Sequence, residues 1–105
     1  MAYKLIITER AEEQLEQLIR YLIEHFKDKR AAVRLLDSIE SVYERLEDNP
    51  MQFPACQDLV LKQRGYRKAK IPNMAYVMIC RPETGSQKVY VIGIFHELEN
   101  YGTKL

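Results

Sequence analysis

The chain has 105 residues, which is enough for one domain with a modest core, spanning residues 1–105, and too few for two. Its 47% hydrophobic and 30% charged residues are typical of a globular protein, and no apolar run is long enough to cross a membrane. The net charge of +1 hides a division: residues 1–58 carry 8 basic and 12 acidic side chains, whereas residues 59–105 carry 8 and 3, which indicates a basic working surface in the C-terminal half.

A β-prone segment, residues 2–7, opens the chain and ends at Thr8, whose side chain can cap a following helix. This segment does not resemble a signal peptide, because its apolar run is short and an acidic residue follows directly. We therefore expect a first strand and a cytoplasmic protein.

Two helices are predicted next. The first runs to about Lys27, and the second is capped by Asp28 and stops before Asn49 and Pro50, since proline forbids continuation. Their apolar residues recur with the helical period, at Ala11, Leu15, Leu18, Ile19, Leu22 and Phe26, and then at Ala32, Leu35, Leu36, Ile39, Val42, Tyr43 and Leu46. The short connection predicts an antiparallel helical hairpin.

The second half of the chain is predicted to be strands and turns. Residues 50–65 contain two prolines and are expected to form a loop, with Phe53 anchored in the core. Strands are predicted over residues 65–71, 75–80 and 89–95, separated by a turn at residues 72–73 and a loop over residues 81–86. The order predicts an α+β fold with a three-stranded antiparallel meander, both helices on one face of the sheet and the other face free. The first strand is expected beside the last.

Basic side chains concentrate in the first strand of this meander. Between residues 59 and 81 there are six basic residues and no Asp or Glu, which favours phosphate binding. Lys68 and Lys70 alternate with Ala69 and Ile71, so both lysines should project from the open face, while Arg67 should pack inward. The alternative is a solvated edge strand, since lysine also discourages aggregation of strand edges.

The two cysteines, Cys56 and Cys80, have neither metal-type spacing nor a disulfide framework around them. We interpret them as buried free thiols. No metal ion and no cofactor are expected.

The layout, together with ITERA (residues 7–11), NPMQFP (49–54) and GYRK (65–68), resembles the RelE/ParE superfamily of toxins from type II toxin–antitoxin systems. The resemblance covers essentially the whole chain, and His96 and Tyr101 fit the family's usual ending. It implies a small growth-arresting toxin that is neutralised by a cognate antitoxin lying across the helices and the basic sheet face. The superfamily has two activities: RelE-like members cut mRNA on the ribosome, and ParE-like members poison DNA gyrase.

The first hypothesis from the resemblance is a ribosome-dependent, metal-independent mRNA endoribonuclease. Such cleavage needs a base, cations that stabilise the phosphorane and an acid. Lys68 and Lys70 match the paired lysines of RelE-like nucleases, His96 would be the general acid or base, and Tyr101 would stack on a base of the message. In this hypothesis the partners are the antitoxin and the ribosome with its message.

Two departures from the nuclease pattern are evident. Val77 and Glu97 stand where RelE-like nucleases carry arginines. Replacement phosphate-binding arginines would have to come from elsewhere, and Arg64, Arg67 and Arg81 are the candidates. Glu97 would then be either a base or a rim charge.

Other readings of these residues stay open. His96 is equally consistent with a structural histidine at a strand end, and Tyr101 with a packing anchor. The second functional hypothesis is a ParE-like gyrase inhibitor without catalytic residues of its own. The third is a degenerate family member that retains only antitoxin binding.

Overall fold

The computed structural model describes residues 2–26 and 29–105. In chain order these residues form β1 (Lys4–Ile7), α1 (Glu9–Phe26), α2 (Lys29–Asp48), a 3₁₀ turn (Pro50–Gln52), α3 (Leu59–Gln63), β2 (Arg67–Lys70), β3 (Tyr76–Glu83), β4 (Lys88–His96) and a C-terminal 3₁₀ turn (Tyr101–Thr103). The predicted helix end at Lys27 and the predicted cap at Asp28 lie outside the described residues.

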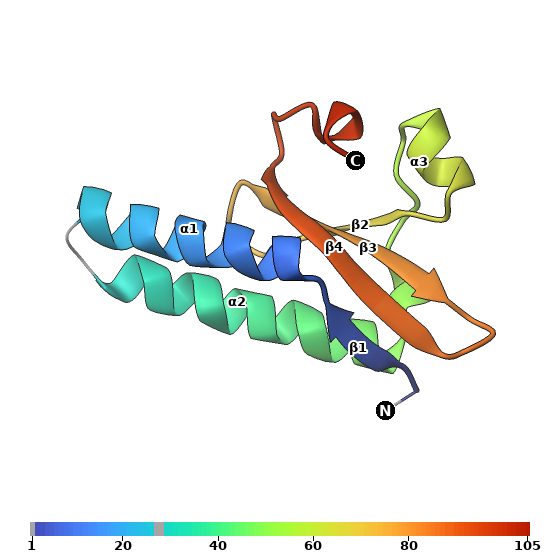
Figure 1. Ribbon diagram of the computed structural model, residues 1–105. Helices are drawn as coiled ribbons and strands as arrows, with labels where there is room; N and C mark the ends of the chain where they lie inside the picture. Colours follow the sequence, from blue (N-terminus) through green and yellow to red (C-terminus); the bar gives the residue numbers. More distant parts are fainter. Residues whose placement is uncertain (1, 27–28) are drawn as a thin grey trace.

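α1 and α2 form the antiparallel hairpin that their periodicity predicts, and they lie side by side (Figure 1). Thr8 caps α1 as expected, because its Oγ1 accepts a hydrogen bond from the Ala11 amide at 3.3 Å. The same hydroxyl donates to the Val91 carbonyl at 2.8 Å and so ties the start of α1 to β4. α2 ends at Asp48, directly before Asn49 and Pro50.

The four strands form one sheet in the order β1-β4-β3-β2. β2, β3 and β4 make the predicted antiparallel meander, and β1 lies beside β4 as expected. β1 runs parallel to β4, so the sheet is mixed. Parallel pairing requires a long crossover, and the helical hairpin between β1 and the meander provides it.

The loop between β3 and β4 is shorter than predicted. β3 extends through Arg81, Pro82 and Glu83, which pair with residues of β4. Pro82 is tolerated within a strand because β2 pairs with β3 only as far as Cys80, which leaves this part of β3 at an edge.

The helices cover one face of the sheet, which we call the helix face. Its cluster joins buried residues of both helices with inward residues of the strands: Ala11, Leu22, Leu35, Ile39, Val42, Leu46, Phe53, Ala69, Ile71, Met78, Cys80, Val89, Val91 and Ile94. Phe53 is 5% exposed and anchors the segment after α2 in this core, as predicted. Both cysteines are buried free thiols, also as predicted.

We call the opposite face of the sheet the lysine face. The sequence predicts that this face is free, but the structure shows that it is partly covered. α3 and the C-terminal residues cover part of it and enclose a second, smaller cluster formed by Cys56, Leu61, Val77, Ile79 and Phe95. Figure 1 shows both elements on the side of the sheet away from the hairpin. The expectation of a plain loop over residues 50–65 is therefore wrong, because Asp58 Oδ1 accepts from the Leu61 amide at 3.1 Å and starts a helical turn there.

Candidate functional site

The two lysines lie on one face of the sheet, as their alternation predicts. Lys68 pairs with Ile79 and Lys70 with Val77, and these partners belong to the smaller cluster. Lys70 Nζ is 3.9 Å from Glu97 Oε2, with side-chain exposures of 68% and 41%. A pair this exposed is worth little to stability, so Lys70 remains available for a ligand.

Arg67 lies on the other side of β2. It pairs with Cys80, whose side chain belongs to the helix-face cluster. Its guanidinium donates to the Phe53 carbonyl at 2.6 Å. This hydrogen bond holds the segment after α2 against the sheet, and the inward packing agrees with the predicted parity. The guanidinium is thus engaged by the fold rather than presented to phosphate.

His96 also lies on the helix face. Its neighbour Phe95 points into the smaller cluster, and alternation along β4 directs His96 the opposite way. The imidazole contacts Tyr76 edge to face, with ring centroids 5.5 Å apart, and Tyr76 packs against the helix-face cluster. Its Nδ1 accepts the Leu98 amide at 3.2 Å. The predicted grouping of His96 with Lys68 and Lys70 is therefore not formed, because the sheet separates them.

Tyr101 is on the lysine face but is used in packing. Its ring lies 5.6 Å from that of Phe95, centroid to centroid, and it joins the smaller cluster. Partial burial raises the pKa of its hydroxyl, with Cys56 and Asp58 adding to the effect. Its exposure is intermediate, so part of the ring still faces solvent.

The remaining predicted arginines differ in how they are held. Arg81 Nη1 is 3.5 Å from Glu83 Oε2, and its guanidinium lies 4.9 Å from the centre of the Tyr90 ring. Arg64 follows α3 as its C-cap and is exposed. Arg64 is thus the more accessible of the two, whereas Arg81 is already paired.

A hollow of about 350 Å³ lies beside His96, between α1 and the end of β4. Its lining includes Gln14 and Glu99, which the sequence analysis did not single out. Gln14 Oε1 accepts the Ile94 amide at 2.8 Å, and Glu99 Oε1 accepts the His96 amide at 3.0 Å. The ammonium of Lys104 bonds to Glu99 and lowers the pKa of that carboxyl. Both side chains accept hydrogen bonds from backbone amides. A sequence pattern seldom indicates this role.

The part of the chain from residue 2 to 26 and from 29 to 105 holds no group of three His, Cys, Asp or Glu side chains that could bind a metal ion. Within the same residues, no helix is long and apolar enough to cross a membrane.

The fold is similar to those of two solved toxin–antitoxin structures. One is the chromosomal ParDE system from P. aeruginosa, with a TM-score of 0.72, 14% identity, and coverage of 90% of this chain and 96% of that one. The other is the RelBE2 complex from Mycobacterium tuberculosis, with a TM-score of 0.59, 19% identity, and coverage of 91% and 99%. Identities this low establish the fold alone.

No curated protein matches the chain in sequence. The model of the ParE toxin of the type II toxin–antitoxin system parDE matches residues 5–101, nearly the whole chain. Together with the fold, this match identifies the chain as a member of the ParE toxin family, in the RelE/ParE superfamily of type II toxins.

Proposed function

We propose that this toxin arrests growth by binding DNA gyrase and that a cognate antitoxin neutralises it. The observation that carries the proposal is the separation of His96 from the lysine pair by the sheet. The match to the ParE family model supports the same choice between the two activities that the sequence resemblance implies.

The separation matters because general acid–base catalysis requires groups within hydrogen-bond reach of the reacting atoms. Lys68 and Lys70 could stabilise a phosphorane on the lysine face, but His96 lies on the helix face and accepts a hydrogen bond from Leu98. Val77 occupies the place of one expected arginine and is buried in the smaller cluster. The lysine face therefore has the positive charge of a binding surface, but it lacks His96 and the arginine that Val77 replaces.

A second candidate is the ribosome-dependent mRNA endoribonuclease. It is favoured by the shared face of Lys68 and Lys70, and the fold similarity to the RelBE2 complex is compatible with it. In that case Glu97, 3.9 Å from Lys70, would take the place of His96 as the base. The partner would then be the ribosome with its message.

The antitoxin would cover apolar side chains that the hairpin leaves exposed. Tyr21 and Ile23 on α1, and Val33 and Leu36 on α2, are all more than a third exposed. Exposed apolar patches mark protein contact surfaces, and these four side chains lie on both helices of the hairpin. Acidic side chains of the same antitoxin would meet Lys68 and Lys70 at the rim of the lysine face. Both similar structures come from toxin–antitoxin systems, which supports this partner.

The proposal is tested with purified toxin, DNA gyrase and relaxed or supercoiled plasmid. We expect inhibition of supercoiling and accumulation of cleaved gyrase–DNA complexes. Ribosome-bound message should remain intact by primer extension. The variant His96→Asn should retain gyrase inhibition, because the imidazole of His96 lies on the face of the sheet away from Lys68 and Lys70.

Discrete message cuts that disappear in the double variant Lys68→Gln/Lys70→Gln would overturn the proposal and establish the nuclease. Harmless expression without any antitoxin, with no effect in either assay, would instead indicate a degenerate toxin that retains only antitoxin binding.

A further inference from the structure

The short helix α3 presents apolar and basic side chains together at the surface. Of its three apolar residues, Leu61 is buried in the smaller cluster, whereas Leu59 and Val60 are 68% and 52% exposed. Lys62 and Arg64, which follow them, are exposed as well. We call these four exposed residues the α3 patch. Neighbouring apolar side chains left in water on so short a helix add nothing to the core, and they are typical of a protein contact surface.

A hollow of about 260 Å³ lies beside the α3 patch, at the edge of the sheet. It forms where β2 and β3 part: β2 pairs with β3 only as far as Cys80, and Gly65, with a φ of 81°, turns the chain from α3 into β2. Met51 and Pro82 give the hollow apolar walls, and Lys62 also lines it. Small-molecule sites have volumes of roughly 300–1,000 Å³, so this smaller hollow suits one large side chain of a partner.

The charge beside the hollow is positive. Among the residues that the structure describes, neither Lys62 nor Arg64 takes part in an ion pair. The carboxylate of Glu83, at the end of β3, is already engaged by Arg81 and by the Ser86 hydroxyl. The two basic side chains of the α3 patch are therefore available to acidic side chains of a partner.

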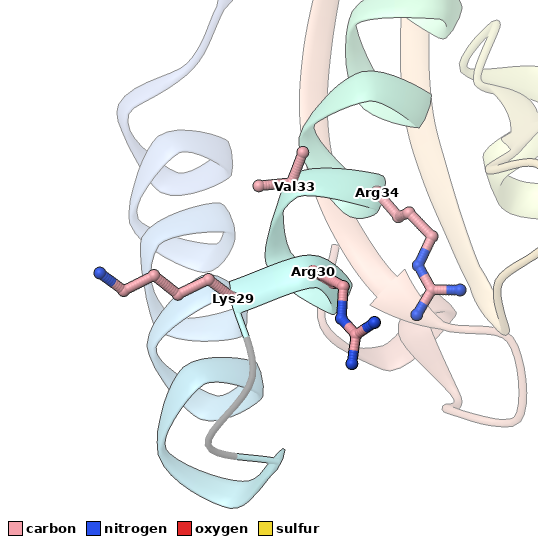
Figure 2. A pocket seen from close by; sticks show the side chains of 4 residues that line it. All are labelled: Lys29, Arg30, Val33 and Arg34. Carbon is pink, nitrogen blue, oxygen red and sulfur yellow. The ribbon is translucent and has the colours of Figure 1, made fainter.

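Apolar and basic side chains also meet on the hairpin. Figure 2 shows Val33 beside three basic side chains, Lys29, Arg30 and Arg34, around a hollow of about 650 Å³ at the start of α2. Val33 is one of the exposed apolar side chains that the antitoxin would cover. Figure 1 shows α3 on the side of the sheet away from the hairpin. The α3 patch is thus a separate surface, suited to a different partner.

We propose that the α3 patch and its hollow bind a segment of the target enzyme in which one large apolar side chain is flanked by acidic side chains. The apolar side chain fills the hollow, Leu59 and Val60 pack around this anchor, and Lys62 and Arg64 meet the acidic groups. Anchors in pockets at the centre of an interface supply most of the binding energy of protein complexes. The inference rests on the proposed function, since it takes DNA gyrase to be the enzyme.

The test measures the affinity of the purified toxin for immobilised DNA gyrase by surface plasmon resonance, with inhibition of supercoiling followed in parallel. We expect Leu59→Ser/Val60→Ser to weaken binding by about tenfold or more, because two side chains at the centre of the interface are lost. Lys62→Gln/Arg64→Gln should slow association and reduce its dependence on salt. Both patch variants should need a higher toxin concentration for half-inhibition of gyrase.

Two matched controls change exposed side chains outside the α3 patch. Leu98→Ser is the control for the apolar variant, and Arg20→Gln is the control for the charge variant. Neither control should change the affinity for gyrase by more than about twofold. In both patch variants the affinity for the cognate antitoxin should fall far less than the affinity for gyrase, and circular dichroism would verify that the variants fold.

Unchanged gyrase binding in either patch variant, with a wild type that inhibits gyrase, would overturn this inference and leave the proposed function standing. A loss of antitoxin affinity as large as the loss of gyrase affinity would also overturn it, because the patch would then belong to the antitoxin. A wild type that does not bind gyrase at all would overturn the proposed function and this inference together.

Discussion

The two faces of the sheet are covered by elements of very different size. On the helix face, α1 and α2 span 18 and 20 residues and pack their periodic apolar side chains into the larger cluster. On the lysine face, a five-residue helix and a three-residue turn enclose the smaller cluster. Short elements bury few side chains and hold few backbone hydrogen bonds, which makes them the first parts of a protein to open. Most of the buried apolar core therefore lies on the helix face, whereas Lys68 and Lys70 lie on the less firmly covered lysine face.

The largest expected effect is the difference between two leucine truncations. Leu46 on the helix face and Leu61 on the lysine face are 0% and 1% exposed. Leu→Ala in a core costs about 2–5 kcal/mol, depending on how far the surroundings can collapse around the cavity. We expect Leu46→Ala to fall in the upper half of this range and Leu61→Ala near its lower end, because α3 can shift to fill the space. Urea denaturation measures both free energies of unfolding.

Leu98→Ala is the control for this pair, since Leu98 is 87% exposed and its truncation should leave the free energy of unfolding nearly unchanged. Equal losses for Leu46→Ala and Leu61→Ala would mean that both faces belong to one cooperative core, and the comparison would fail.

The two cysteines allow the covers of the two faces to be compared locally, since one thiol lies under each cover. Burial raises the pKa of the Cys80 thiol on the helix face to about 12, and burial also raises the pKa of Cys56 under α3. Neither native thiol should react at neutral pH until the protein opens. We expect iodoacetamide to label Cys56 at least about tenfold faster than Cys80, which corresponds to about 1.4 kcal/mol less opening free energy.

Mass spectrometry of time points resolves the two labelling rates. Leu61→Ala should accelerate the labelling of Cys56 far more than that of Cys80, because it weakens the cover of only one thiol. Identical rates for both thiols would indicate that labelling occurs only through global unfolding.

The same contrast in element size explains which parts of the structure the sequence predicts. Periodic residues such as Leu35, Ile39 and Val42 predict the helix face, because many positions report one buried stripe. A five-residue helix has too few positions for a period, so only the cap at Asp58 could have indicated α3.

The face on which His96 lies could not be predicted, for a different reason. Val91, Ile94 and Phe95 are all buried, because both faces of β4 are covered at this point. A continuous apolar run hides the alternation that separates the two faces, so the sequence could not indicate on which side His96 would lie. For Lys68 and Lys70 the sequence predicts the face correctly, because polar and apolar residues alternate along β2.

The smallest expected effect concerns the ion pair between Glu99 and Lys104, which helps to hold the C-terminal residues. The Lys104 ammonium lowers the pKa of Glu99 in the folded protein below its ordinary value of 4.5. A carboxyl with a lowered folded-state pKa contributes stability that is complete above its unfolded pKa and is lost as the pH falls through the folded pKa. Glu99→Gln should therefore destabilise the protein by no more than about 1 kcal/mol at pH 7, since the pair is partly exposed. Urea denaturation in steps from pH 7 into acid should show that the difference in unfolding free energy between wild type and Glu99→Gln is constant down to about pH 5 and vanishes below it.

Glu13→Gln, a change at an exposed site on α1, controls for the removal of one surface charge. A difference that persisted unchanged into acid would mean that Glu99 acts through packing or its hydrogen bond to the His96 amide, and not through its charge.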